Sequence, residues 1–78
     1  MIFVRRAQQL LQQRQDSNDV NLIHLLISGF SKQDESFEFK SFEVPALFPI
    51  EHVQEILSEI DKKLYVSCDS GKFLISIK

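Results

Sequence analysis

The stretch that decides the fold is residues 49–78, PIEHVQEILSEIDKKLYVSCDSGKFLISIK. Its first part predicts a helix over residues 49–62, because its apolar residues recur at steps of three or four and share one helical face. These residues are Ile50, Val53, Ile56, Leu57 and Ile60. Proline suits the first helical position, where a missing N–H costs nothing, so we expect Pro49 to begin this helix.

The second part, residues 64–78, predicts a β-hairpin. Apolar and polar residues alternate on both sides of Asp69, Ser70 and Gly71, which are residue types that favour turns. A two-residue loop at Ser70 and Gly71 places three apolar pairs on one face: Leu64 with Ile77, Val66 with Ile75, and Cys68 with Phe73. A shift of one residue divides this apolar set between both faces, so the pattern predicts this register alone.

Residues 1–15 predict an amphipathic helix with a narrow apolar face. Four apolar residues lie at helical steps, namely Phe3, Ala7, Leu10 and Leu11. The other positions carry glutamines and arginines, among them Arg5 and Arg6. A helix of this length is marginal alone in water, so we expect it to pack against a sheet or a partner.

Residues 20–44 are expected to contribute two strands. Residues 20–27 are almost all apolar, which fits a strand buried on both faces. Their spacing and their three leucines also fit a helix, so the helical alternative stays open.

The second of these strands contains Phe37, Phe39, Phe42 and Val44 in an alternating pattern. The alternation slips between Phe39 and Phe42, which indicates either a β-bulge or the end of the strand at Phe39. We expect the bulge, which returns both side chains to one face, because Glu43 and Val44 resume the pattern. After this strand, Pro45 and Pro49 bracket residues 46–48, so we expect an extended segment there that cannot be a central strand.

Together these segments predict a single α+β domain over residues 1–78, in the order helix, strand, strand, helix, strand, strand. The antiparallel sheet is expected to pack against the second helix. So small a sheet has edges, and Tyr65 and Leu74 are neighbours on the outer face of its hairpin. The first helix covers that pair, or a second copy covers it and forms a homodimer.

The composition is ordinary for a soluble globular chain, with 44% hydrophobic and 26% charged residues. One cysteine excludes an internal disulfide and a Cys-x-x-Cys metal framework, and fits a reducing compartment. No apolar run approaches the roughly 20 residues that span a bilayer, and the start lacks the pattern of a secretory signal. We therefore expect a cytoplasmic protein with no transmembrane segment.

Residues able to do chemistry are few. His24 lies inside an apolar run and is interpreted as a hydrogen-bonded core residue, whereas His52 is expected in solvent. Cys68 is expected to face inward as a small core residue. Asp61 and Asp69 are interpreted as a helix-end and a turn residue. Because nothing pairs these groups at ligand or acid–base spacing, we expect no metal, no cofactor and no enzymatic activity.

Charge is distributed unevenly along the chain. Residues 1–15 carry three arginines and no acid, residues 16–61 carry ten acids and two lysines, and residues 62–78 carry four lysines and one acid. Within the acidic segment, Glu51, Glu55 and Glu59 recur every four residues and form an acidic ridge on the predicted helix. The ridge is a solvated surface or a docking stripe for a basic partner.

The sequence therefore predicts a small non-enzymatic protein that binds another protein through the acidic ridge or an exposed sheet edge. An acidic middle makes nucleic acid a poor general partner. The alternative hypothesis is a membrane-surface or nucleic-acid accessory protein, in which Arg5 and Arg6 of the N-terminal helix contact the target.

Overall fold

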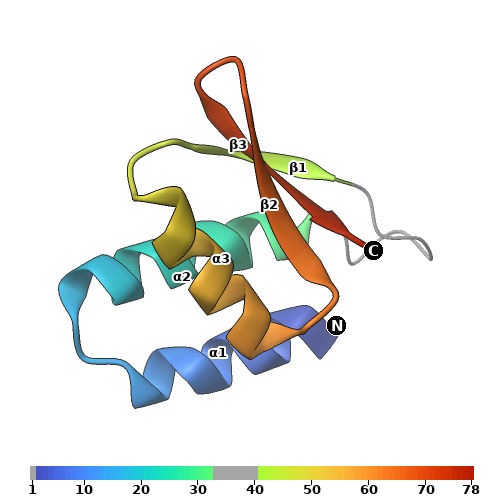
Figure 1. The fold of residues 1–78 in the computed structure, drawn as a ribbon. Helices are drawn as coiled ribbons and strands as arrows, with labels where there is room; N and C mark the ends of the chain where they lie inside the picture. The colour runs from blue at the N-terminus through green and yellow to red at the C-terminus, as the bar shows by residue number, and fades with distance from the viewer. Residues whose placement is uncertain (1, 33–40) are drawn as a thin grey trace.

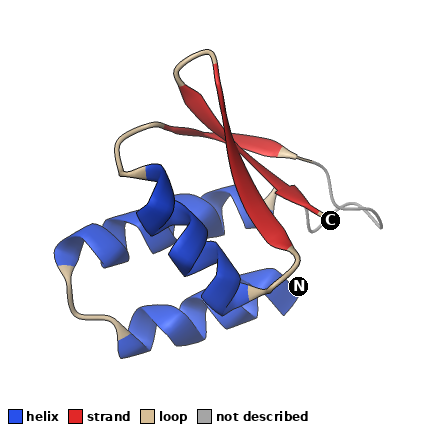
Figure 2. Ribbon diagram, viewed as in Figure 1, coloured by secondary structure: helices blue, strands red, loops and turns tan. Residues whose placement is uncertain are grey.

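The computed structural model describes residues 2–32 and 41–78. Three helices gather on one side of a three-stranded antiparallel sheet (Figure 1, Figure 2), which confirms the predicted α+β class. The elements are α1 (Ile2–Gln13), α2 (Ser17–Ser31), β1 (Phe42–Pro45), α3 (Ile50–Ile60), β2 (Leu64–Asp69) and β3 (Lys72–Ile77). The strand order β1-β3-β2 puts the last strand in the centre. Among the described residues, no helix has the length and apolar character needed to cross a membrane.

Helix α3 forms the predicted second helix and buries the predicted face. Val53, Ile56, Leu57 and Ile60 are buried in the core. Pro49 is the N-cap residue, one position earlier than expected, with an extended backbone at φ −60° and ψ 138°. Its carbonyl accepts the first bond of the helix, from the Val53 N–H at 3.1 Å, so the proline still stands where its lost donor costs nothing.

Strands β2 and β3 form the predicted hairpin in the predicted register. Leu64 pairs with Ile77, Val66 with Ile75, and Cys68 with Phe73. Ser70 and Gly71 both have positive φ, 53° and 79°, as a type I′ two-residue turn requires. Cys68 shares the face of Phe73, as predicted, but the prediction that it is a core residue was wrong, because its side chain is exposed. β2 is an edge strand, and its turn end projects beyond the helices (Figure 1), so no helix covers the cysteine in the described part of the chain.

Residues 20–27 lie in helix α2, so the predicted strand was wrong and the helical alternative was correct. Asp16 caps the helix, and its side chain accepts hydrogen bonds from the N–H groups of Asn18 and Asp19. α2 packs against α1, α3 and β1. A helix in contact with three neighbours buries a wide arc of its surface, which is why this segment is nearly continuous in apolar residues.

Strand β1 is the short outer strand and pairs only with β3. Phe42 lies opposite Ile75 and Val44 opposite Phe73, so both face the helices as predicted. Phe37 and Phe39 lie outside the described residues, as does Lys40, so the bulge predicted between Phe39 and Phe42 stays a prediction. Pro45 belongs to an edge strand, as its missing donor demands.

Helix α1 packs its predicted face, Phe3, Ala7 and Leu10, against α2 and α3. The centre of the core is made by side chains from α2, α3 and the hairpin: Phe30, Leu22, Ile23, Leu26, Ile56, Leu57, Leu64, Ile75 and Val53. The ring of Phe30 joins the layers, because it contacts Phe3 at 5.5 Å and Phe42 at 5.2 Å between ring centroids.

Gly29 lies inside helix α2, where glycine is usually unfavourable. A Cβ atom at this position would lie 2.2 Å from Cε2 of Phe42, because the phenylalanine ring rests on the helix backbone. The glycine therefore allows β1 to approach α2.

We predict that Gly29→Ala lowers the free energy of unfolding by about 1–3 kcal/mol, because the Phe42 ring must move out of a packed position. Urea denaturation measures the change. Ser28→Ala, at the exposed neighbouring position of the same helix, is the control and should change stability little. Equal stability of both variants would contradict this packing role.

Candidate functional site

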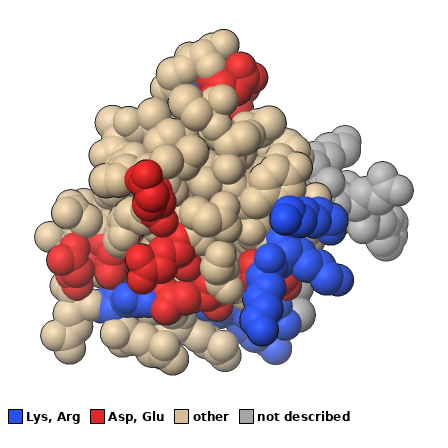
Figure 3. Space-filling view, viewed as in Figure 1, with Lys and Arg blue, Asp and Glu red and all other residues tan. Residues whose placement is uncertain are grey.

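The acidic side chains of α3 are exposed, as predicted, but they are not equivalent. Figure 3 shows acidic residues spread over the face of the molecule that α3 forms. Glu59 forms an ion pair with Nη2 of Arg14. Glu51 and Glu55 have no Lys or Arg nitrogen within 4 Å in the described part of the chain. The predicted ridge is therefore divided into one neutralised and two open carboxylates.

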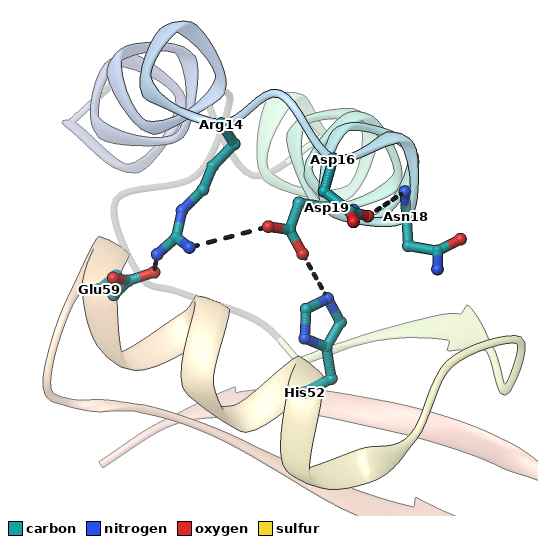
Figure 4. Close-up of polar contacts among 6 residues, drawn as sticks. All are labelled: Arg14, Asp16, Asn18, Asp19, His52 and Glu59. Carbon is teal, nitrogen blue, oxygen red and sulfur yellow. Dashed lines mark hydrogen bonds and ion pairs between the residues drawn. The ribbon is translucent and has the colours of Figure 1, made fainter.

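Arg14 and His52 converge on Asp19 at the junction of the three helices (Figure 4). Nη1 of Arg14 lies 3.7 Å from Oδ2 of Asp19, and Nε2 of His52 lies 2.6 Å from Oδ1. The Asp19 side chain is only 11% exposed. This cluster connects the end of α1, the first turn of α2 and α3. The prediction that His52 lies in solvent was wrong, since its side chain is 29% exposed and turns toward Asp19.

The arginines of the N-terminal helix differ in the same way. Nη1 of Arg6 lies 2.7 Å from Oδ2 of Asp61, while Arg14 pairs with Asp19 and Glu59. Arg5 is exposed and has no carboxylate within 4 Å among the described residues. Two of the three arginines therefore already pair with carboxylates of this chain.

A groove runs between α3 and β2, with a volume of about 490 Å³. Its lining consists of Ile50, Glu51, Gln54, Glu55, Ser58 and Val66. The two α3 carboxylates without a cation partner, Glu51 and Glu55, both belong to this lining, and the partly buried Ile50 and Val66 give it an apolar component. It thus combines negative charge with apolar surface.

Gln54 ties the groove wall to the sheet. Its Nε2 donates to the Leu64 carbonyl at 3.2 Å, and its Oε1 accepts from the Val66 N–H at 3.1 Å. Nε2 also lies 3.1 Å from Oγ of Ser58. A side-chain amide from α3 therefore satisfies two backbone groups of the edge strand β2.

The other sheet edge, on β1, is short and poor in donors. Pro45 has no N–H, and its carbonyl accepts from the Leu47 N–H at 2.9 Å. Glu43 adds a charged side chain, and its Oε2 lies 3.5 Å from Nζ of Lys72. Short strands, prolines and charges are features that oppose pairing with another chain.

The outer face of the hairpin carries Tyr65 and Leu74, as predicted, and both are partly buried. The register sets Tyr65 opposite Ser76 and Leu74 opposite Ser67, so the two are diagonal rather than direct neighbours. Helix α1 does not cover this face, because it packs against α2 and α3. Nζ of Lys78 lies 5.9 Å from the centroid of the Tyr65 ring.

The remaining reactive side chains do not assemble into a site. His24 is exposed on α2, so its predicted core position was wrong. Cys68 and Asp69 are exposed near the hairpin turn. Residues 2–32 and 41–78 contain no group of three His, Cys, Asp or Glu that could hold a metal ion. The absence of a cofactor and of enzymatic activity stays a prediction.

Comparison with family models, curated proteins and solved structures gives no match. The function is therefore argued from the surface of this chain. Sequence reasoning found the two carboxylates of the groove but missed Gln54 and the Asp19 cluster. Neither has a sequence signal, because each joins residues that approach only in the folded chain.

We predict that Asp19→Ala lowers the free energy of unfolding by about 1–3 kcal/mol, since a partly buried arginine and histidine lose their shared partner. Chemical denaturation measures the loss, with Asn21→Ala, an exposed position of the same helix, as control. A double-mutant cycle with Arg14→Ala should give a coupling energy above about 0.5 kcal/mol. Additive effects would contradict a direct interaction.

Proposed function

We propose that the chain is a small non-enzymatic module that binds another protein through the groove between α3 and β2. One observation carries the proposal: the two glutamates of this groove lack a cation partner, whereas Glu43, Glu59, Asp19 and Asp61 each have one among the described residues. Asp16 and Asp69 also lack a cation partner among the described residues, but Glu51 and Glu55 are the two that stand together beside an apolar surface.

The chemistry of the groove favours a partner segment with basic and apolar side chains. Glu51 and Glu55 are four residues apart on one helix, where like charges repel by a few tenths of a kcal/mol. A bound Lys or Arg relieves this repulsion and gains charge complementarity. Ile50 and Val66 offer apolar contact to the residues between the basic ones.

A selection from a random peptide library tests the proposal. We predict that the wild-type chain enriches peptides with Lys or Arg near apolar residues, and that Glu51→Gln with Glu55→Gln weakens their binding at least about tenfold. The matched control is Gln8→Lys with Gln12→Lys, which changes net charge equally and at the same spacing on exposed positions of α1. Enriched peptides without basic residues, or equal losses in both variants, would refute the groove as the site.

A second candidate function follows from the basic residues that surround the end of α3. The Lys78 N–H donates to the Lys63 carbonyl at 2.9 Å, which brings the last residue beside the turn after α3. Arg6 reaches Asp61 at the same turn. Figure 3 shows Lys and Arg side chains gathered next to the acidic face. This basic corner, Arg6, Lys62, Lys63 and Lys78, supports contact with a polyanion such as an anionic membrane or a nucleic acid.

For the second candidate, we predict that binding to phosphatidylserine vesicles or to an oligonucleotide falls roughly a hundredfold between 50 and 200 mM salt, as release of three or four counterions requires. Lys62→Glu with Lys63→Glu should abolish it. Lys32→Glu with Lys72→Glu, which changes net charge equally elsewhere, should retain most of it. Binding that neither salt nor the first pair affects would exclude the basic corner.

A further inference from the structure

Along the outer edge of β2, backbone N–H and C=O groups that do not bond to β3 lie beside the groove. Asp69 and Lys72 close a two-residue turn, so they form a hydrogen-bonded pair of the hairpin. Such pairs alternate along the ladder, and the bond from the Lys78 N–H to the Lys63 carbonyl fits this alternation. The N–H and C=O groups of Leu64, Val66 and Cys68 therefore point away from β3.

The side chain of Gln54 already bonds two of these backbone groups. Its amide donates to Leu64 and accepts from Val66, as the peptide group of an additional strand would. The Val66 carbonyl and both backbone groups of Cys68 have no partner strand in this register. Cys68 is next to the last residue of β2, and Figure 1 shows that the turn end of this strand projects beyond α3, where a segment of another chain can approach it.

We propose that an extended segment of the partner adds as a strand to the outer edge of β2, displaces the Gln54 amide, and places basic side chains against Glu51 and Glu55. This inference rests on the proposed function and gives the partner segment a conformation. Main-chain hydrogen bonds to an edge strand supply affinity, and alternate side chains supply specificity.

The spacing of the charges supports an extended partner. Residues four apart on a helix are separated by about 6 Å along its axis. Alternate residues of a strand are separated by about 6.6 Å and point to the same side. Since α3 and β2 lie side by side and run in opposite directions (Figure 1), Lys or Arg at alternate positions of an added strand can meet both glutamates.

Strand addition is directed to β2 and not to β1. On β1 the backbone groups of Phe42 and Val44 point toward β3, because their partners Ile75 and Phe73 have backbone groups that point away from β2. The backbone groups of Glu43 and Pro45 therefore point away from the sheet. Pro45 lacks a donor, and its acceptor is already used. On β2 a neutral side-chain amide holds the edge, and hydrogen bonds of a displacing strand can replace its own.

The first test uses eight-residue peptides of defined sequence as probes. A peptide that alternates Lys and Val should bind to the wild-type chain and slow amide hydrogen exchange at Cys68, measured by NMR. A block peptide of identical composition and a peptide that alternates Glu and Val are the controls. Failure of the alternating peptide to bind, or binding without protection of the Cys68 amide, would overturn strand addition.

The second test changes the edge itself. Gln54→Ala should tighten binding of the alternating peptide roughly tenfold, because the competing amide is gone. Gln8→Ala, the same substitution at an exposed position of α1 outside the groove, should leave affinity unchanged. Cys68→Pro removes an N–H that faces away from β3, so it should weaken binding while the hairpin persists. Unchanged or weaker binding by the Gln54 variant would contradict displacement of its amide.

The two proposals fail separately. If Glu51→Gln with Glu55→Gln weakens the selected peptides but the Cys68 amide stays unprotected and Gln54→Ala has no effect, the groove binds its partner in another conformation. If the charge-neutralising pair has no effect, the groove is not the site and the proposed function falls.

Discussion

The whole structure depends on the burial of one face of helix α3. Val53, Ile56, Leu57 and Ile60 pack into the core shared with α1, α2 and the hairpin. Full burial of one aliphatic side chain contributes roughly 1.5–3 kcal/mol, so a few such residues match the stability expected of a whole small domain. Because this face is fixed inside, the orientation of every other α3 side chain is fixed as well.

The polar sides of α3 have distinct surroundings as a result. On one side, His52 and Glu59 turn toward Asp19 and Arg14 and connect the three helices. On the other side, Glu51 and Glu55 line the groove with Gln54 and Ser58. Helix α3 thus forms ion pairs with the other two helical segments on one side, and on the other side it presents two glutamates with no cation partner among the described residues. This division explains why an acidic pattern that is regular in sequence is not uniform in its contacts.

The two edge strands of the sheet are protected from pairing with another chain by different features. β1 relies on its short length, its proline and a charged residue, which are permanent properties of its backbone and composition. β2 relies on two hydrogen bonds from the side chain of Gln54, which belongs to another element, α3. An edge protected by side-chain hydrogen bonds differs physically from one blocked by proline, and this difference is the basis for proposing strand addition at β2.

The sequence by itself determined the elements whose patterns are local. The stripe of α3, the face of α1 and the register of the hairpin follow from the spacing of apolar residues and from Ser70 and Gly71, because neighbours along the chain decide them. Only the tertiary structure decided the rest. Residues 20–27 fit a strand or a helix until α1, α3 and β1 surround them, and Cys68 is exposed because no described element packs over the end of its edge strand. The contacts of Asp19 with His52 and of Gln54 with β2 arise from long-range packing, which no spacing in the sequence encodes.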